Sequence, residues 1–69
     1  MNNFRVRVNG NEVECVAGMG LLNLFAQLGI NPKLVAIEYN GEILHRQFWT
    51  DKVIVDGDVL EVVTIVGGG

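Results

Sequence analysis

The sequence predicts an α+β domain in which a mixed sheet of about five strands wraps around one short helix. Three observations support this class. Asn-Gly pairs at residues 9–10 and 40–41 each separate two short apolar stretches, which is the pattern of tight hairpins. Between the hairpins, residues 21–28 carry helical spacing. A run rich in β-branched residues, 59–65, supplies a last strand.

Length and composition limit the possible functions. The chain has 69 residues, which fits one small domain, and its 49% hydrophobic and 19% charged residues are typical of a folding sequence. The net charge of −3 argues against nucleic acid or an anionic membrane as the main partner. It favours a protein partner with a basic surface.

The single cysteine, Cys15, excludes an internal disulfide, as expected for a reducing compartment. The sequence has no basic-then-apolar leader and no apolar run near 20 residues. We therefore expect a cytoplasmic protein, with Cys15 serving as a small buried hydrophobe.

The first hairpin is predicted from residues 4–8 and 11–16. Residues 4–8 alternate between apolar and basic side chains, which is the period of a half-buried strand. Residues 11–16 form the return strand, and its two glutamates lie beside the two arginines of the first strand. Such cross-strand charge pairs contribute only about 0.2–1 kcal/mol each, so they help to set the register.

The helix is predicted over residues 21–28, after a loop at 17–20. Four apolar side chains fall at i, i+3, i+4 and i+7, which places one stripe on the sheet. These are Leu21, Leu24, Phe25 and Leu28. Gly29 occupies the position of a C-terminal cap, and Pro32 prevents continuation.

The second hairpin is predicted from residues 34–39 and 42–44. Residues 45–49 show no clean period, and we expect the aromatic side chains of Phe48 and Trp49 to close the open end of the core. Residues 50–55 connect onward, with a turn of helix near Thr50 and Asp51, to a turn at 56–58.

The last strand, 59–65, decides the architecture. Nearly continuous β-branched residues are typical of a strand with neighbours on both sides, so we expect it at the sheet centre, parallel to the first strand. The resulting order is that of a β-grasp domain over residues 1–66, followed by a flexible tail at 67–69. Alternation turns Leu60, Val62 and Thr64 to the helix. The residues between them lie on the open face of the sheet, away from the helix: Val59, Glu61, Val63 and Ile65. These four side chains either form a docking patch for a partner or are covered by neighbouring side chains.

The sequence lacks a catalytic or metal-binding constellation. His45 is the only histidine, the acidic residues have no calcium-loop spacing, and no cysteine cluster could hold zinc. The Gly18-Met19-Gly20 loop lacks the further glycine and lysine of a phosphate loop. We therefore predict no active site, no metal and no bound cofactor.

The three glycines Gly67, Gly68 and Gly69 form a thread without side chains that ends in a carboxylate. From Val66 onward it reaches roughly 13 Å and could enter a tunnel that other residues would block. A frayed terminus or a cloning scar is the alternative. Because the tail follows a strand that we expect at the centre of the sheet, a functional tail is favoured over a frayed terminus or a cloning scar.

Four segments together resemble the ThiS sulfur carriers of thiamine biosynthesis, a family with the ubiquitin-like β-grasp fold. They are Val35–Ile43, Arg46 with Trp49, Asp56–Val63 and Val66–Gly69. The resemblance covers the C-terminal half in motif and the whole chain in length and strand order. Related families with the same fold are the small subunit of molybdopterin synthase and the ubiquitin-like protein modifiers.

The resemblance implies that the chain is a carrier and not an enzyme. A ThiF-like activating enzyme would use ATP and magnesium to adenylate the carboxylate of Gly69, and a sulfur donor enzyme would convert it to a thiocarboxylate. Gly67 and Gly68 would complete the tail that enters the partner's tunnel. A ThiG-like thiazole synthase would receive the sulfur. The alternatives are sulfur delivery for molybdopterin, protein modification or simple binding.

Overall fold

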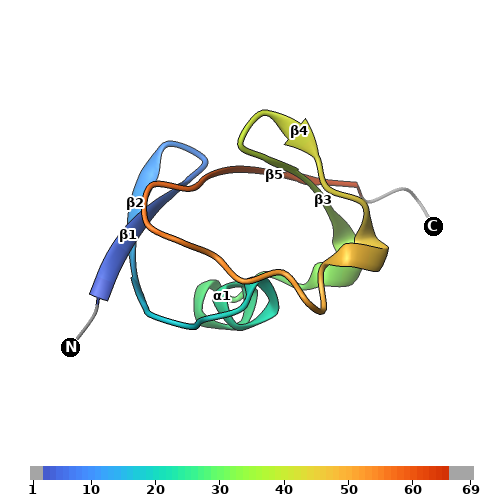
Figure 1. The fold of residues 1–69 in the computed structure, drawn as a ribbon. Helices are drawn as coiled ribbons and strands as arrows, with labels where there is room; N and C mark the ends of the chain where they lie inside the picture. The colour runs from blue at the N-terminus through green and yellow to red at the C-terminus, as the bar shows by residue number, and fades with distance from the viewer. Residues whose placement is uncertain (1–2, 66–69) are drawn as a thin grey trace.

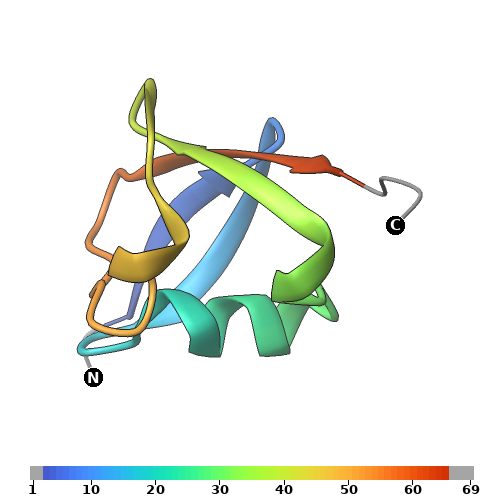
Figure 2. The same cartoon turned by 90° about the vertical axis from the view of Figure 1, so that its right-hand side faces the viewer.

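The computed structural model describes residues 3–65, so residues 1–2 and 66–69, which include the predicted tail at 67–69, lie outside the described part of the chain. The elements follow in the order β1 (Asn3–Val8), β2 (Asn11–Val16), α1 (Leu21–Leu28), η1 (Pro32–Leu34), β3 (Val35–Tyr39), β4 (Glu42–Ile43), η2 (Arg46–Phe48) and β5 (Val59–Thr64). One curved sheet covers a single helix, which confirms the predicted α+β class (Figures 1 and 2).

Strand β5 lies at the centre of the sheet, as predicted. The strand order is β2-β1-β5-β3-β4, with β5 parallel to β1 and antiparallel to β3. In Figure 1, β5 runs between the two hairpins. The chain therefore leaves the domain from the middle of the sheet. The strand ends at Thr64, one residue earlier than predicted.

Both predicted Asn-Gly turns are present. The φ angles are 51° and 86° at Asn9 and Gly10, and 52° and 86° at Asn40 and Gly41. This left-handed backbone is strained for most side chains, and asparagine and glycine are the residues that tolerate it best. The two-residue turns set the register of each hairpin, with Val8 opposite Asn11 in the first.

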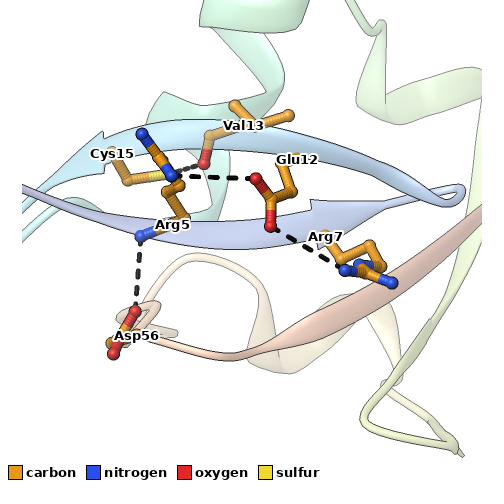
Figure 3. Close-up of polar contacts among 6 residues, drawn as sticks. All are labelled: Arg5, Arg7, Glu12, Val13, Cys15 and Asp56. Atoms are coloured by element: carbon orange, nitrogen blue, oxygen red, sulfur yellow. Dashed lines mark hydrogen bonds and ion pairs between the residues drawn. The ribbon is translucent and has the colours of Figure 1, made fainter.

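The first hairpin carries the predicted charges on its outer face (Figure 3). One Glu12 oxygen lies 3.8 Å from Arg5 Nη1 and the other lies 3.8 Å from Arg7 Nη2. All three side chains are more than half exposed, so these pairs contribute little to stability. The main-chain N–H of Arg5 also donates to the Asp56 carboxylate at 3.4 Å.

Helix α1 lies against one face of the sheet (Figure 2), and three side chains of its apolar stripe belong to the core. Leu21, Leu24 and Phe25 are buried, whereas Leu28 at the end of the stripe is 36% exposed. The helix ends at Gly29 with a φ of 71°, the predicted left-handed cap. An eight-residue helix is held by this packing and not by its own propensity.

The aromatic prediction for residues 45–49 was half wrong. Trp49 is buried and meets Phe25 edge to face, with ring centroids 5.4 Å apart. Phe48 is 53% exposed, because the η2 turn directs the two neighbouring side chains differently. The helical turn therefore lies at 46–48 and not at Thr50 and Asp51, which form an ordinary turn.

Two smaller details complete the strands. Leu34 belongs to the η1 turn, so β3 begins one residue later than predicted. Thr64 lies on the helix side of the sheet, as predicted, where it lines a groove with Ile30 and Val62, but it is exposed. In the part of the chain that the structure describes, no helix is long and apolar enough to cross a membrane.

Candidate functional site

The candidate site consists of β5 and the segment that follows it. The main-chain N–H of Ile65 donates to the Leu34 carbonyl at 2.7 Å, so pairing with the β3 side persists to the last described residue. The predicted tail residues Gly67, Gly68 and Gly69 lie outside the described residues. What the structure provides is the base from which the tail starts.

An asparagine side chain anchors the beginning of β5. The Oδ1 atom of Asn40 accepts a hydrogen bond from the Val59 N–H at 2.8 Å, and its Nδ2 donates to Asp58 Oδ1 at 3.1 Å. The Asn40 N–H also donates to the Val59 carbonyl at 2.7 Å. The turn residue therefore continues the β3–β5 ladder.

Asp58 is the buried residue of the hydrogen-bond network at the start of β5, with 6% of its surface exposed. Its carboxylate accepts hydrogen bonds from the Tyr39 hydroxyl, from the Asn40 amide and from the Val55 N–H at 2.9 Å. Burial works to raise the pKa of Asp58, but these hydrogen bonds and the nearby Lys52 outweigh it and hold the pKa below its ordinary value.

Tyr39 is the counterpart of Asp58 in this network. Burial, followed by the hydrogen bond and the negative charge of Asp58, raises the pKa of the Tyr39 hydroxyl far above its ordinary value. The hydroxyl therefore remains a donor at all physiological pH values. The Lys52 ammonium lies 4.5 Å from the centre of the Tyr39 ring, close enough for a cation–π interaction.

A second asparagine holds the other end of β5. The Asn9 side chain accepts a hydrogen bond from the Val62 N–H at 2.7 Å and donates one to the Val62 carbonyl at 3.2 Å. Sequence reasoning recognised Asn9 and Asn40 only as turn residues. Their second role was missed because both partners lie on a strand that is distant in the sequence.

The four open-face residues predicted for docking are all exposed. Val59, Val63 and Ile65 have exposed fractions of 40%, 57% and 49%, and Glu61 is exposed as well. Neighbouring side chains therefore leave a large part of each of these residues exposed. Ile43 extends this face, because it pairs with Glu38, which in turn pairs with Glu61, and it is 67% exposed. Sequence analysis missed Ile43 because β4 is only two residues long.

The remaining candidates have ordinary environments. Cys15 is buried, and its Sγ atom lies 3.8 Å from the Val13 carbonyl (Figure 3). Burial, with a smaller contribution from the charge of Glu14, raises the pKa of the Cys15 thiol and disfavours the reactive thiolate. His45 is exposed. Within residues 3–65, no group of three or more histidine, cysteine or acidic residues could hold a metal ion.

Comparison with known proteins agrees with this arrangement. The family model of ThiS matches residues 6–69, and the match includes the three glycines. The sulfur carrier protein ThiS of Bacillus subtilis is 32% identical over 65 residues, which cover 93% of this chain and 98% of that protein.

A thiazole synthase from Paramagnetospirillum magneticum is 37% identical over 66 residues. The match covers 96% of this chain but only 20% of the synthase, so the chain spans a small part of that relative. The crystal structure of the thiamine biosynthesis protein ThiS from Geobacter metallireducens superimposes with a TM-score of 0.80 at 28% identity, covering 96% of this chain and 100% of that one.

Proposed function

The chain belongs to the ThiS family and is a sulfur carrier of thiamine biosynthesis, and from this membership we propose that the sulfur travels on the carboxylate of Gly69. The observation that carries the proposal is the position of β5, because the glycine segment follows a strand at the centre of the sheet. The family match through residue 69 supports the same assignment.

The chemistry requires activation of that carboxylate. A C-terminal carboxyl group has an ordinary pKa of about 3.5, so it is ionised at neutral pH, and an anion resists nucleophilic attack. In the proposed first step, a carboxylate oxygen attacks the α-phosphorus of ATP, pyrophosphate leaves, and an acyl adenylate forms. A ThiF-like adenylating enzyme supplies ATP and magnesium. This chain contributes only the substrate group.

Sulfur enters when a persulfide of the donor enzyme attacks the acyl carbon and AMP leaves. A thiol then cleaves the sulfur–sulfur bond, forming a disulfide and releasing the thiocarboxylate. Gly67, Gly68 and Gly69 suit this exchange because an unbranched thread can pass through a narrow tunnel into each partner's site. A ThiG-like thiazole synthase receives the sulfur. The two thiazole synthases that contain a region similar to this chain support that partner.

The open face of the sheet is the proposed docking surface, formed by Val59, Glu61, Val63 and Ile65 with Ile43. Apolar side chains exposed next to the start of the tail favour a partner that holds the domain while the tail enters its site. The shared surface explains how one small domain could visit two enzymes in turn.

Intact-mass analysis of the chain from its native cell tests the proposal. Protein from cells starved of thiamine should contain a species in which one oxygen is replaced by sulfur, and fragmentation should place the change at Gly69. Sulfur located elsewhere, or no such species in starved cells, would contradict the proposal. Cells supplied with thiamine serve as the control.

A further inference from the structure

The last residue of β5 has main-chain groups that point away from its β3 neighbour. On the β3 side, the Ile65 N–H donates to Leu34 and the Val59 carbonyl accepts from Asn40. Peptide groups of an antiparallel strand alternate in direction, so residues 59 and 65 face β3 while Thr64 faces the opposite side. The N–H and C=O of Thr64 therefore point to the side on which β1 lies.

Strand β1 has already ended at this level. Its last main-chain bond to β5 runs from the Asn9 N–H to the Leu60 carbonyl at 2.9 Å, and the Asn9 side chain then occupies both main-chain groups of Val62. The chain turns back at Gly10. Among residues 3–65, no turn, loop or side-chain hydrogen bond reaches the N–H or C=O of Thr64.

A groove of about 390 Å³ lies beside this free edge. Its aliphatic walls come from Ile30, Leu34 and Val62, and Leu34 is 46% exposed. Asn9 and Thr64 also line the groove. A free donor, a free acceptor and an aliphatic groove therefore occur together, where the chain leaves the sheet.

We propose that this edge is a strand-addition site for an extended segment of the adenylating enzyme. A main-chain carbonyl of that segment accepts the Thr64 N–H, and a main-chain N–H donates to the Thr64 carbonyl. An aliphatic side chain of the segment fills the groove between Ile30, Leu34 and Val62. The occupant is a polypeptide, because the free N–H and C=O of Thr64 are spaced to pair with the C=O and N–H of a residue on an added strand.

This inference rests on the proposed function, because it concerns the enzyme that takes up the tail. Only the free main-chain groups of Thr64 lie on the side of β5 away from β3, since the groove is also lined by Leu34 and Val35. The groove includes Ile30, which follows α1, so the site lies on the helix side of the sheet and is distinct from the open-face docking surface. It would seat the last residue of the sheet directly against the enzyme, five residues before Gly69.

Replacing Thr64 with proline tests the proposal. Proline removes the free N–H of residue 64 but breaks no hydrogen bond within the sheet. A strand tolerates proline where the N–H does not take part in the ladder. The matched control is Glu12→Pro. The Arg7 N–H donates to the main-chain carbonyl of Asp58 on the β5 side, so Arg7 makes no main-chain hydrogen bond to its β2 partner Glu12. The Glu12 N–H therefore faces solvent at the far edge of the sheet.

Equilibrium titration of the purified adenylating enzyme with each variant measures the dissociation constant. Thr64→Pro should bind about tenfold more weakly than the wild type, the usual effect of one lost hydrogen bond. Glu12→Pro should bind like the wild type. A folded Thr64→Pro variant with unchanged affinity would overturn the proposal.

Amide hydrogen exchange of the wild-type chain keeps the test decisive if Thr64→Pro fails to fold. The Thr64 amide should exchange rapidly in the free chain and become protected in the complex. Continued rapid exchange in the complex would overturn the strand-addition site and leave the carrier function intact. A wild-type chain that neither binds the enzyme nor undergoes adenylation would overturn both proposals together.

Discussion

The side chain of Asn9 binds both main-chain groups of Val62, so a turn residue replaces the strand residue that β1 no longer provides. The two residues are 53 positions apart in the sequence. This pairing continues the hydrogen bonding of β5 beyond Leu60, the last residue of β5 bonded by the Asn9 main chain. It makes the first Asn-Gly turn a structural support of the candidate site.

Removing the Asn9 amide should therefore weaken the domain. Asn9→Gly keeps the left-handed turn but deletes both hydrogen bonds, and we expect a loss of about 1–2 kcal/mol in urea unfolding. Asn9→Asp should also lose stability, because an oxygen replaces the donor that faces the Val62 carbonyl. Faster amide exchange at Val62 should accompany both changes. Wild-type stability in Asn9→Asp would show that the pairing contributes nothing.

The Asp58 network should make stability depend on pH. The folded-state pKa of Asp58 lies below its unfolded value of about 3.9, so the charged form stabilises the folded state at neutral pH. This contribution is lost as the pH falls below about 4 and passes through the folded-state pKa. The free energy of unfolding should therefore differ most between wild type and Asp58→Asn at pH 7, and the difference should shrink at pH 3. An equal difference at both values would contradict this role.

The core should depend on the contact between Phe25 and Trp49. Phe25→Ala removes a fully buried ring from an edge-to-face pair, and we expect a loss of about 3–5 kcal/mol. In a domain of this size that loss can abolish folding. Leu22→Ala on the same helix is the control, because Leu22 is 37% exposed and should cost far less. Similar melting temperatures for the two variants would contradict the assignment of the core.

The open face should contribute to partner binding and little to folding. Val63→Asp places a charge on a side chain that is 57% exposed, so we expect at least about tenfold weaker binding to the adenylating enzyme. Val16→Asp is the matched control, since Val16 is 52% exposed on β2, at the far edge of the sheet. Comparable binding of the two variants would exclude Val63 from the docking surface.

Much of the fold could be predicted because its signals are local. The Asn-Gly turns require particular backbone angles, the stripe from Leu21 to Phe25 has helical spacing, and the β-branched run of β5 indicates a strand with two neighbours. The exposure of Phe48 could not be predicted in this way. It depends on which way a short 3₁₀ turn directs one side chain.

The candidate site was predictable in outline only. Alternation along β5 correctly placed Val59, Val63 and Ile65 on the open face, since a strand has a period of two. The hydrogen bonds of Asn9, Asn40 and Asp58 were not predictable, because each joins segments that meet only in the folded sheet. Ile43 lies on the docking surface because β4 pairs with β3. A strand of two residues is too short for its pattern of side chains to predict that pairing.

The central claim is that the carboxylate of Gly69 is activated, and ATP–pyrophosphate exchange with the purified adenylating enzyme tests it most directly. The chain with a Gly69 carboxylate should support exchange, whereas the same chain amidated at Gly69 should support none, because no carboxylate oxygen remains to attack ATP. Gly68→Val should fold normally but exchange poorly, since a β-branched side chain widens the thread and restricts its backbone. Near-normal exchange with the amidated chain would contradict the account.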